Sequence, residues 1–507
     1  MPVDFLGDAE VAAYGRFVGV PSVEELERFC FLDDVDRALI DRRREDHARL
    51  GFAVQLTTAR AVGAFLADPA EVPSVVVDYL AGQLGISDGS CLAAYSARRT
   101  TRFEHAEQIR RSYSLVSFGE VAKELEVWID ARAWTTGDGP TALFVGSVGW
   151  LRDRRVVLPG LTTLTRLVAR VREEALERLW DRLCDVLTVE QRTELDDTLT
   201  VGDGTRVSAL ERWRRGPVAA SGRGLERALR RVAEIDRVGL VGADFVVVVP
   251  HRRLVEVARY GMSASASHLR RHHPIRRLAT LAATVVELKG RAIDDCLELF
   301  DLVMVTELLG KAERVAENEK LRRHASLVRA STVLASAVGV LLDPVWGPDA
   351  QLAVVLAAID AIVDRSALHG AHDIVVALAP GTVIDEDADM RAALATRIGT
   401  VSGFARLFTE VIEFDANPDG QPVLDAACRL PELLGQRRPL SVGDIDESLV
   451  RGSWRPLVFA GDDPVDRGAY VLCVLTLLHR HLKRREIFAP GSTRWRDPRA
   501  QLLSGPA

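Results

Sequence analysis

The sequence predicts a mainly α protein of several domains with at most a small β element. Apolar residues recur at helical spacing, and Leu50, Val54, Ala61 and Phe65, for example, fall on one helix face. Helix start signals are frequent, whereas β-compatible runs are few and short. A chain of 507 residues with 48% hydrophobic side chains is large enough for about two to four domains with their own cores.

The charge balance limits where a polyanion can bind. The formal net charge is -7, so any nucleic-acid site must be a local patch. Arginine greatly outnumbers lysine, a bias that GC-rich coding alone produces, and only clusters of arginine therefore count as evidence. The six cysteines form no CxxC pair, which indicates buried thiols in a reducing cytoplasm. Acidic residues follow the first residues immediately, so no signal peptide is expected.

The stretch 32–66 predicts two linked helices. Asp33 and Asp34 are suited to cap the first helix. Basic side chains crowd the junction, where the C-terminal end of the first helix favours cations. They are Arg42, Arg43, Arg44, His47 and Arg49. This junction is a candidate phosphate-binding surface.

Two capping boxes mark further helix starts. Ser22 with Glu25, and Thr101 with Glu104, have the spacing at which a hydroxyl and a carboxylate satisfy each other's free backbone N–H groups. A helix from about 121 to 134 should end at the Gly/Pro turn 136–140.

After Pro159-Gly160 the pattern predicts a long amphipathic helix that runs to about Leu187.

β-compatible runs are limited to a few places. The segments 143–145 and 155–158 predict a small hairpin around Trp150, and 245–249 is the best single strand candidate. The run 373–376 is a weaker one.

The most apolar part of the chain is 333–342, resuming at 352–363. Asp343 and Pro344 interrupt it, so we expect a buried helix pair and no membrane span. The acidic loop at 385–389 is expected to be a solvated turn.

Several short blocks follow one another in a recognisable order. They are MPVDFL (1–6), YGRF (14–17), LDD (32–34), RLGFAVQL (49–56), VP (72–73), YLA (79–81), QLGI (83–86), TRFEH (101–105), a Pro-Gly, Thr-Thr-Leu, Arg-Leu-Val run (159–168), LFDL (299–302), KAER (311–314) and 484–499. Together they resemble Tn3-family transposases, whose opening domain is of the DUF4158 type. The similarity runs from one end of the chain to the other but reaches only the first half of the family protein.

The resemblance implies a domain order. We expect an N-terminal DNA-binding domain of the DUF4158 type at 1–157, a second helical DNA-binding domain at 158–290, and a helical dimerisation or linker region at 291–507. The DNA-binding domains are expected to be helix-turn-helix-like, with helices in the major groove and arginines on phosphates.

Clustering and position in the family match together nominate the DNA-binding residues. They are Arg42, Arg43, Arg49 and Arg60 in the opening helices; Arg98, Arg99 and Arg102; Thr162, Thr163 and Arg166 after Pro159-Gly160; and Arg270, Arg271, Arg276 and Arg277. The alternative for each cluster is a solvated helix face. A further basic cluster between 212 and 231 has the same two interpretations.

No catalytic, metal or cofactor site is predicted. In the family, an RNase H-like domain in the half not matched here carries the Asp, Asp and Glu that bind two divalent metals, and Mg²⁺ is expected only there. His268, His272 and His273 have no carboxylate or thiol at ligand spacing, so they predict no metal site. Phosphate-loop and nucleophile-elbow motifs are also absent from the sequence.

The leading hypothesis is therefore the DNA-binding portion of a Tn3-family transposase, which recognises the terminal inverted repeats of its element without cutting them by itself. The resemblance implies double-stranded DNA as partner, a homodimer, no membrane, and a bacterial cytoplasmic, nucleoid-associated location. A helical scaffold that has lost DNA binding by decay stays open as the alternative. A stand-alone nuclease ranks last, because no carboxylate trio is found.

Overall fold

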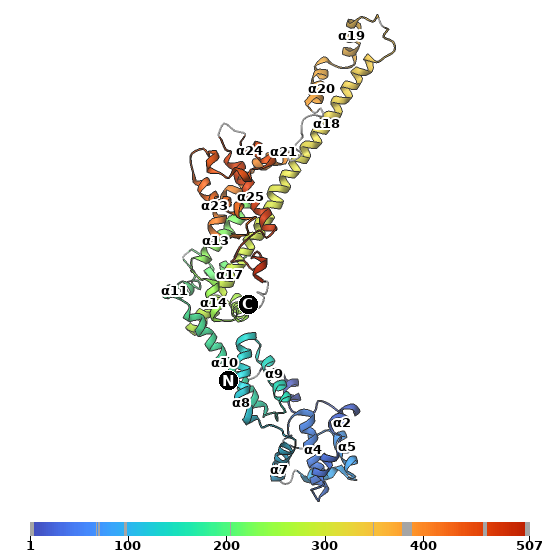
Figure 1. The fold of residues 1–507 in the computed structure, drawn as a ribbon, viewed down its shortest axis with the longest axis vertical. Coiled ribbons are helices and arrows are strands. Elements are labelled where there is room, and N and C mark those ends of the chain that lie inside the picture. Colours follow the sequence, from blue (N-terminus) through green and yellow to red (C-terminus); the bar gives the residue numbers. More distant parts are fainter. Residues whose placement is uncertain are drawn as a thin grey trace. The chain divides into compact units, whose positions relative to one another are not determined.

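A computed structural model describes residues 5–66, 68, 71–95, 99–202, 204–347, 349–377, 388–459 and 464–501. Its regular structure is almost entirely helical (Figure 1). Within the described ranges, one two-stranded antiparallel sheet joins β1 (Asp415–Ala416) to β2 (Ile487–Phe488). The predicted mainly α class with a small β element is confirmed.

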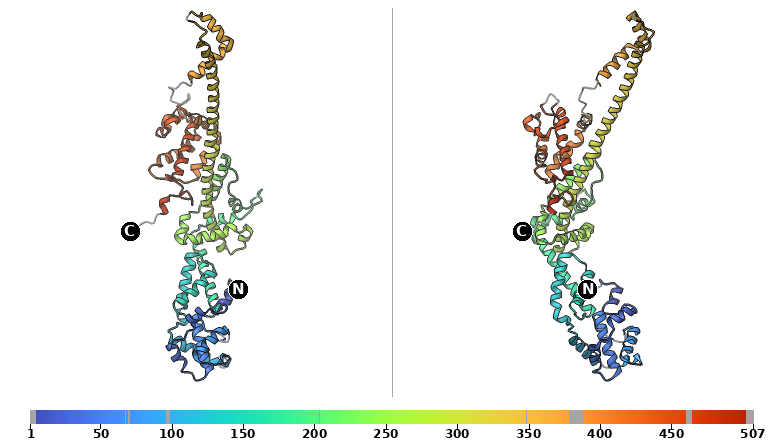
Figure 2. Two further views of the ribbon diagram at one scale, coloured as in Figure 1. Left: turned by 90° about the vertical axis from the view of Figure 1, so that its right-hand side faces the viewer. Right: turned by 45° about the vertical axis from the view of Figure 1, so that its right-hand side comes forward.

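The chain divides into two compact units. Unit 1 comprises Met1–Arg192 and Ala243–Thr284, and unit 2 comprises Thr193–Gly242 and Val285–Ala507. Each unit has interior helices of its own, which can be followed in the further views of Figure 2. The functional boundaries expected near 157 and 290 stay predictions.

Unit 1 consists of consecutive short and medium helices. These are α1 (Asp8–Ala13), α2 (Val23–Phe29), α3 (Asp34–Ile40), α4 (Asp46–Val62), α5 (Ser74–Leu84), α6 (Leu92–Tyr95), α7 (Arg99–Ser112), α8 (Phe118–Thr136), α9 (Pro140–Asp153), α10 (Leu161–Asp185), α15 (His251–Ser263) and α16 (Ala266–Arg270). Three more helices reach its limits: α11 (Val189–Asp197), α14 (Gly242–Val248) and α17 (Pro274–Leu302).

Helix α4 organises the interior of unit 1. Its first turns bury Leu50, Phe52 and Val54 in one hydrophobic core with α2, α3, α5, α6 and α7. Its last turn buries Val62 in a second core with α8, α9 and α10. One helix therefore contributes to both cores, and its sequence is apolar almost all round where it is most enclosed.

Local signals in the first hundred residues are largely confirmed. Asp33 caps α3, and its carboxylate accepts from the N–H of Asp36 at 2.8 Å. Ser22 and Glu25 form the expected capping box on α2. The box expected at Thr101 is wrong, because α7 already includes Arg99 and Thr101 lies within it.

The helices predicted after residue 120 are also confirmed. Helix α8 ends at Thr136 with Gly137 in the left-handed conformation, φ 71°. Helix α10 covers Leu161–Asp185, close to the expected 159–187.

Unit 2 is built around longer helices. They are α12 (Ala209–Trp213), α13 (Gly222–Asp236), a π-helical turn (Val303–Leu309), α18 (Gly310–Leu341), α19 (Leu352–Ile362), α20 (Arg365–Ala377), α21 (Ala388–Ala395), α22 (Ile398–Val411), α23 (Gln421–Gly435), α24 (Arg455–Val458) and α25 (Arg467–Lys483).

Buried carboxylates on the unit 2 part of α17 hold its C-terminal segment. Asp294 is 6% exposed and accepts hydrogen bonds from the backbone N–H groups of Thr493 and Arg494, both at 3.1 Å. Asp301 pairs with His479 at 2.7 Å and Lys483 at 2.6 Å on α25. The block at 484–499 therefore packs as an integral part of this unit.

The hairpin predicted around Trp150 is wrong. Residues 143–145 lie in α9, which Pro140 opens at its first turn. Leu143 and Leu151 are both fully buried, eight residues apart on one helix face. Of the second expected strand, Val156 forms a single parallel bridge to Val116.

The strand candidates at 245–249 and 373–376 are wrong as well. In α14, Phe245 and Val249 are buried while Val247 is 86% exposed, which is the helical period and not alternation. The run 373–376 lies in α20. Short β-branched runs do not distinguish a strand from a helix by composition, and tertiary packing decided both cases.

The apolar segments 333–342 and 352–363 are helical as expected, but most of their apolar side chains are not buried. Leu341, Leu352 and Ile362 are 54%, 71% and 63% exposed. One described helix, Pro274–Leu341, has the length and hydropathy of a membrane-crossing segment, although only 11% of its most apolar window is buried.

The acidic loop at 385–389 lies mostly outside the described residues. Asp389 is described, in α21, and it forms a two-bond ion pair with Arg323 of α18 at 2.7 and 2.8 Å. That carboxylate has a structural partner.

A glycine pair tests how α4 packs. A methyl group at Gly51 would overlap the ring of Tyr95, whereas one at Gly82 in α5 would meet nothing within 4 Å. We expect Gly51→Ala to lower the free energy of unfolding by about 1–3 kcal/mol through overpacking. The matched change Gly82→Ala should raise it by up to ~1 kcal/mol through helix propensity. Chemical denaturation measures both, and equal effects would contradict the packing described.

Candidate nucleic-acid interface

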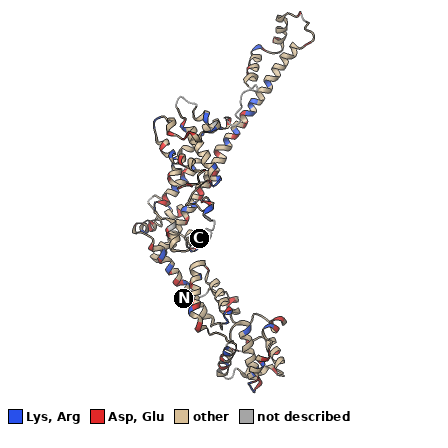
Figure 3. Ribbon diagram, viewed as in Figure 1, with Lys and Arg blue, Asp and Glu red and all other residues tan. Residues whose placement is uncertain are grey.

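All the nominated residues that the structure describes belong to unit 1. Helices α3 and α4 flank the basic junction, which the chain crosses in five residues. Lys and Arg alternate with Asp and Glu along the helices (Figure 3). The electrostatic surroundings of each cationic residue therefore decide whether it is available to a phosphate.

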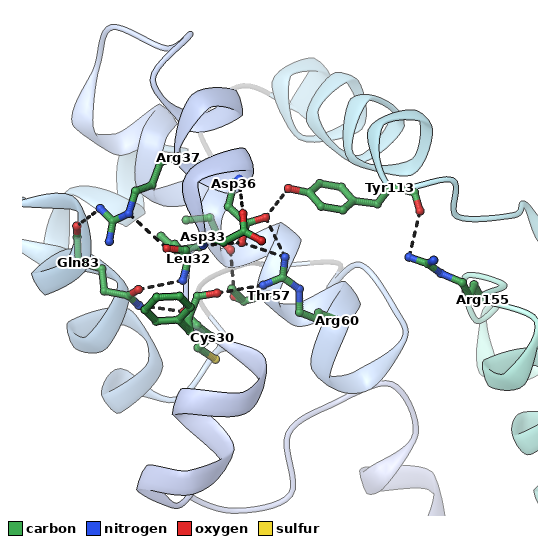
Figure 4. A network of polar contacts seen from close by, with 12 residues as sticks. Cys30, Leu32, Asp33, Asp36, Arg37, Thr57, Arg60, Gln83, Tyr113 and Arg155 are labelled. Atoms are coloured by element: carbon green, nitrogen blue, oxygen red, sulfur yellow. Dashed lines mark hydrogen bonds and ion pairs between the residues drawn. The ribbon is translucent and has the colours of Figure 1, made fainter.

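Arg60 lies at the centre of an intramolecular network (Figure 4). Its guanidinium donates two hydrogen bonds to the Asp36 carboxylate, at 2.8 and 2.9 Å, and one to the carbonyl of Phe31 at 3.0 Å. Asp36 is fully buried and also accepts a hydrogen bond from the Tyr113 hydroxyl. Removing one partner of such a pair leaves a buried charge, so Arg60 has a structural role in joining α3, α4 and α7.

Arg43 is also held inside the unit. Its guanidinium lies 3.5 Å from the centroid of the Phe52 ring and donates to Nε2 of His105 at 3.3 Å and to Gln108 at 2.6 Å. Burial lowers the pKa of Arg43. The side chain serves packing as much as any outward contact.

The junction itself presents a mixed surface. Arg49 pairs with Asp41 at 3.1 Å and with Asp46 at 3.4 Å, and its side chain is 24% exposed. Arg42 and Arg44 are exposed. Of the arginines nominated here, Arg42 is therefore the one directed most fully to solvent.

The next group is only partly described. Arg98 lies outside the described residues, and the side chain of Arg99 is not described although its backbone belongs to α7. Arg102 is half-buried, with its guanidinium 5.0 Å from the ring centroid of Phe103.

The start of α10 is the least encumbered group. Gly160 precedes the helix, and Thr162, Thr163 and Arg166 are all exposed in its first turns. A helix N-terminus offers free N–H groups and the positive end of the helix dipole to an anion. Two hydroxyls and a guanidinium therefore flank a favourable position for a phosphate.

The group at 270–277 surrounds an aromatic cluster near the other end of α10. Arg276 lies 5.1 Å from the ring centroid of Trp180 and 5.7 Å from that of Tyr260. The Tyr260 hydroxyl is 2.6 Å from Nε2 of His272. Burial lowers the pKa of His272, as do the neighbouring charges of Arg276 and His268. Arg276 is thus held by aromatic rings as well as facing outward.

Acidic residues share this groove. A cavity of about 450 Å³ is lined by Arg271 and Arg276 on one side of the sequence and by Glu173, Glu177 and Asp181 of α10 on the other. Arg270 is exposed, and Arg277 donates to the carbonyl of His272 at 3.4 Å. The carboxylates partly offset the positive potential of the group.

The first turns of α10 and the aromatic cluster do not form one compact site. Eighteen residues separate Thr162 from Trp180 in the sequence of this helix, which corresponds to roughly 27 Å at about 1.5 Å per residue. A ligand that contacts both groups must be extended.

Two arginines were not nominated from the sequence. Arg152 and Arg155 line a cavity of about 400 Å³ in unit 1. The hairpin expected at 143–158 concealed them, because a helix that ends without glycine gives no clear stop signal. An apolar pair six positions apart across the helix end, Leu151 and Val156, was the available clue.

Groups suited to a metal ion were also considered. Among the residues with described placement, no cluster of three or more His, Cys, Asp or Glu side chains is arranged to hold one. His268 and His272 pack edge to face at 5.0 Å between ring centroids.

Comparison with known proteins supplies the relationship that geometry alone leaves open. Along its whole length the chain is 33% identical to the transposase for transposon gamma-delta of Escherichia coli. The chain is related to the Tn3-family transposases. Residues 5–171 match the family model described as a domain of unknown function, DUF4158.

Other relatives of the same kind align with the chain. The transposase for transposon Tn4556 of Streptomyces fradiae is 44% identical over 61% of this chain and 36% of its own length. The transposase for transposon Tn501 of Pseudomonas aeruginosa is 28% identical over 95% of this chain and 48% of its own length. The gamma-delta alignment covers 50% of that protein, so the chain spans about half the length of these relatives.

The buried His105 yields a prediction about pH. Nε2 accepts from Arg43, and Nδ1 is 2.9 Å from the Tyr95 hydroxyl, so the neutral ring fits the site. Burial and then the charge of Arg43 lower the pKa of His105 to about 4. Its stabilising contribution is therefore complete above the unfolded pKa of about 6.5 and is lost as pH falls toward 4.

We expect the free energy of unfolding to fall between pH 7 and pH 4.5, and the fall to be smaller in His105→Gln. The difference between the two proteins should be at most about 3 kcal/mol. Denaturant titrations at both pH values measure it. Parallel pH profiles would contradict the neutral, buried state of this histidine.

Proposed function

We propose that this chain binds the terminal inverted repeats of a mobile DNA element and takes part in its transposition. The observation that carries the proposal is the similarity, over the whole chain, to proteins named as transposases. The cell compartment that fits this function is the bacterial cytoplasm, in contact with the nucleoid. Binding without strand cleavage is the activity proposed for the chain by itself.

The exposed cationic residues of unit 1 are the proposed contacts. Arg42, Arg166 and Arg271 are directed to solvent, and Thr162 and Thr163 stand beside free N–H groups at the start of α10. Phosphate contacts from such groups fix the register of a protein on a duplex, and base contacts add sequence preference. Arg43, Arg49 and Arg60 support the scaffold that holds them.

The first test compares two duplexes. The purified chain is titrated against the terminal repeat of its own element and against a scrambled duplex of equal length, at two salt concentrations. We expect tighter binding to the true end and weaker binding at high salt, because phosphate contacts release counterions. Equal, weak binding to both duplexes would favour the alternative, a helical scaffold without DNA binding.

A charge-removal series locates the contacts. We expect the combined variant Arg42→Gln, Arg166→Gln, Arg271→Gln to bind the true end more weakly and to lower the salt slope by about three, since each phosphate contact contributes about 0.9. The control is Arg178→Gln, whose guanidinium is paired with Asp130 at 2.7 Å. Gel-shift titrations measure both. An unchanged slope in the combined variant would show that these arginines are solvated surface.

Unit 2 supports a homodimer in the same function. Helix α18 carries exposed apolar residues at Leu321 and Val328, seven positions apart, and Leu342 follows two further heptads on. Their exposed fractions are 61%, 52% and 75%. Helices α19 and α20 pack against α18 (Figure 1) and leave this stripe uncovered. An apolar stripe of period seven suits the matching stripe of a second copy.

We expect the chain to be a dimer at micromolar concentration and the double variant Leu321→Glu, Val328→Glu to be a monomer. Two carboxylates in an apolar seam meet their counterparts and must be desolvated. The control is Val127→Glu, at a residue 70% exposed on α8. Sedimentation equilibrium measures the mass of each. A dimer that survives the double substitution would place the contact elsewhere.

A further inference from the structure

A cavity of about 400 Å³ lies where the two hydrophobic cores of unit 1 meet. Phe29 and Leu56 of the first core line it, as does Val156 of the second. The aromatic ring of Tyr113 and the guanidiniums of three arginines complete much of the wall. A volume of this size is within the usual range of small-molecule sites, roughly 300–1,000 Å³.

The charge of this cavity is positive. Arg60 is neutralised by Asp36, as described above. Arg152 and Arg155 each donate one hydrogen bond, at 3.2 Å, to a backbone carbonyl oxygen. No acidic side chain is among the lining residues. Most of the donor groups of two exposed guanidiniums are therefore available to an anion.

The backbone at Arg155 is a second observation. Arg155 has φ 57°, in the left-handed region that favours glycine. It occupies the position after the α9 C-cap, with Val156 N–H bonded to Leu151 O at 2.9 Å and Arg155 N–H to Arg152 O at 3.0 Å. Glycine is the usual residue of this motif.

Other helices of unit 1 follow the usual rule. Helices α4, α5 and α8 end on Gly63, Gly85 and Gly137, each with a positive φ. At α9 the chain carries a long cationic side chain where glycine would be free of strain. Strained backbone positions concentrate at functional sites, and here the strained residue borders the cavity.

The remaining lining suits a flat ring. A nucleobase can pack on Tyr113 and Phe29, because every base has a π-face that stacks on aromatic side chains. A phosphate attached to it can then accept paired hydrogen bonds from planar guanidiniums. Neither an apolar ligand nor a bare anion uses both parts of the lining.

We propose that this cavity binds a single nucleotide, with the base against Tyr113 and the phosphate between Arg152 and Arg155. The source most consistent with the proposed DNA-binding function, on which this part rests, is a nucleotide unstacked from the bound duplex. A free nucleotide presents the same chemistry, and the experiment separates the two sources.

The first arm uses the full chain and deoxyadenosine 5′-monophosphate in a calorimetric titration. We expect it to bind more tightly than deoxyadenosine or inorganic phosphate. Arg155→Gly should weaken this binding about tenfold, the effect of losing charge-assisted hydrogen bonds. Because glycine relieves the left-handed backbone, the melting temperature should stay the same or rise, so lost binding cannot reflect unfolding.

Arg154→Gln is the matched control. Arg154 is the neighbouring residue, its guanidinium lies 4.0 Å from the Trp150 ring centroid, and it does not line the cavity. Its variant should bind the nucleotide as the unchanged chain does. Equal weakening in both variants, or inorganic phosphate binding as tightly as the nucleotide, would overturn the proposal.

The second arm uses two hairpin duplexes that carry the terminal repeat, one fully paired and one with a single unpaired adenosine. Preference for the unpaired form, lost in Arg155→Gly, identifies the source as DNA. Nucleotide binding without that preference identifies a free nucleotide. If the paired duplex binds specifically but neither the nucleotide nor the unpaired form is preferred, this inference fails and the proposed function stands. If no duplex binds specifically, the proposed function fails whatever the nucleotide does.

Discussion

The buried carboxylate of Asp36 is the interaction on which unit 1 depends most. It is the third residue of α3, it receives two hydrogen bonds from Arg60 at the end of α4, and it accepts one from Tyr113 just after α7. A charge without exposure to water is costly unless it is paired and fully hydrogen-bonded, so these three segments are held in one arrangement. Both cores of the unit and the cavity between them follow from the fixed course of α4.

This constraint also separates two roles of arginine. Arg43 and Arg60 are directed inward, onto an aromatic ring and a carboxylate, and their charge is used to build the unit. Arg42 and Arg166 are directed outward. An acidic protein can bind a polyanion only through the second kind, because the charge of the first is already compensated.

Much of this could be predicted from the sequence, and the failures have a common cause. Asp33, Ser22 and Gly137 mark helix ends through local chemistry that needs no tertiary context, and the structure agrees with each. The runs 143–145 and 245–249 were assigned to strands because β-branched and aromatic residues suit both structures, and only burial on one helical face resolves them. Arginine clustering located candidate surfaces, but a sequence does not reveal that Asp36 lies beneath Arg60.

Arginine footprinting would test the central claim most directly. The full chain is treated with phenylglyoxal, with and without the terminal-repeat duplex, and modified arginines are quantified by mass spectrometry. The account predicts that Arg42, Arg166 and Arg271 become protected by the true end and much less by a scrambled duplex, while Arg60 is unreactive throughout. Protection confined to the arginines of unit 2, or no protection at all, would contradict it.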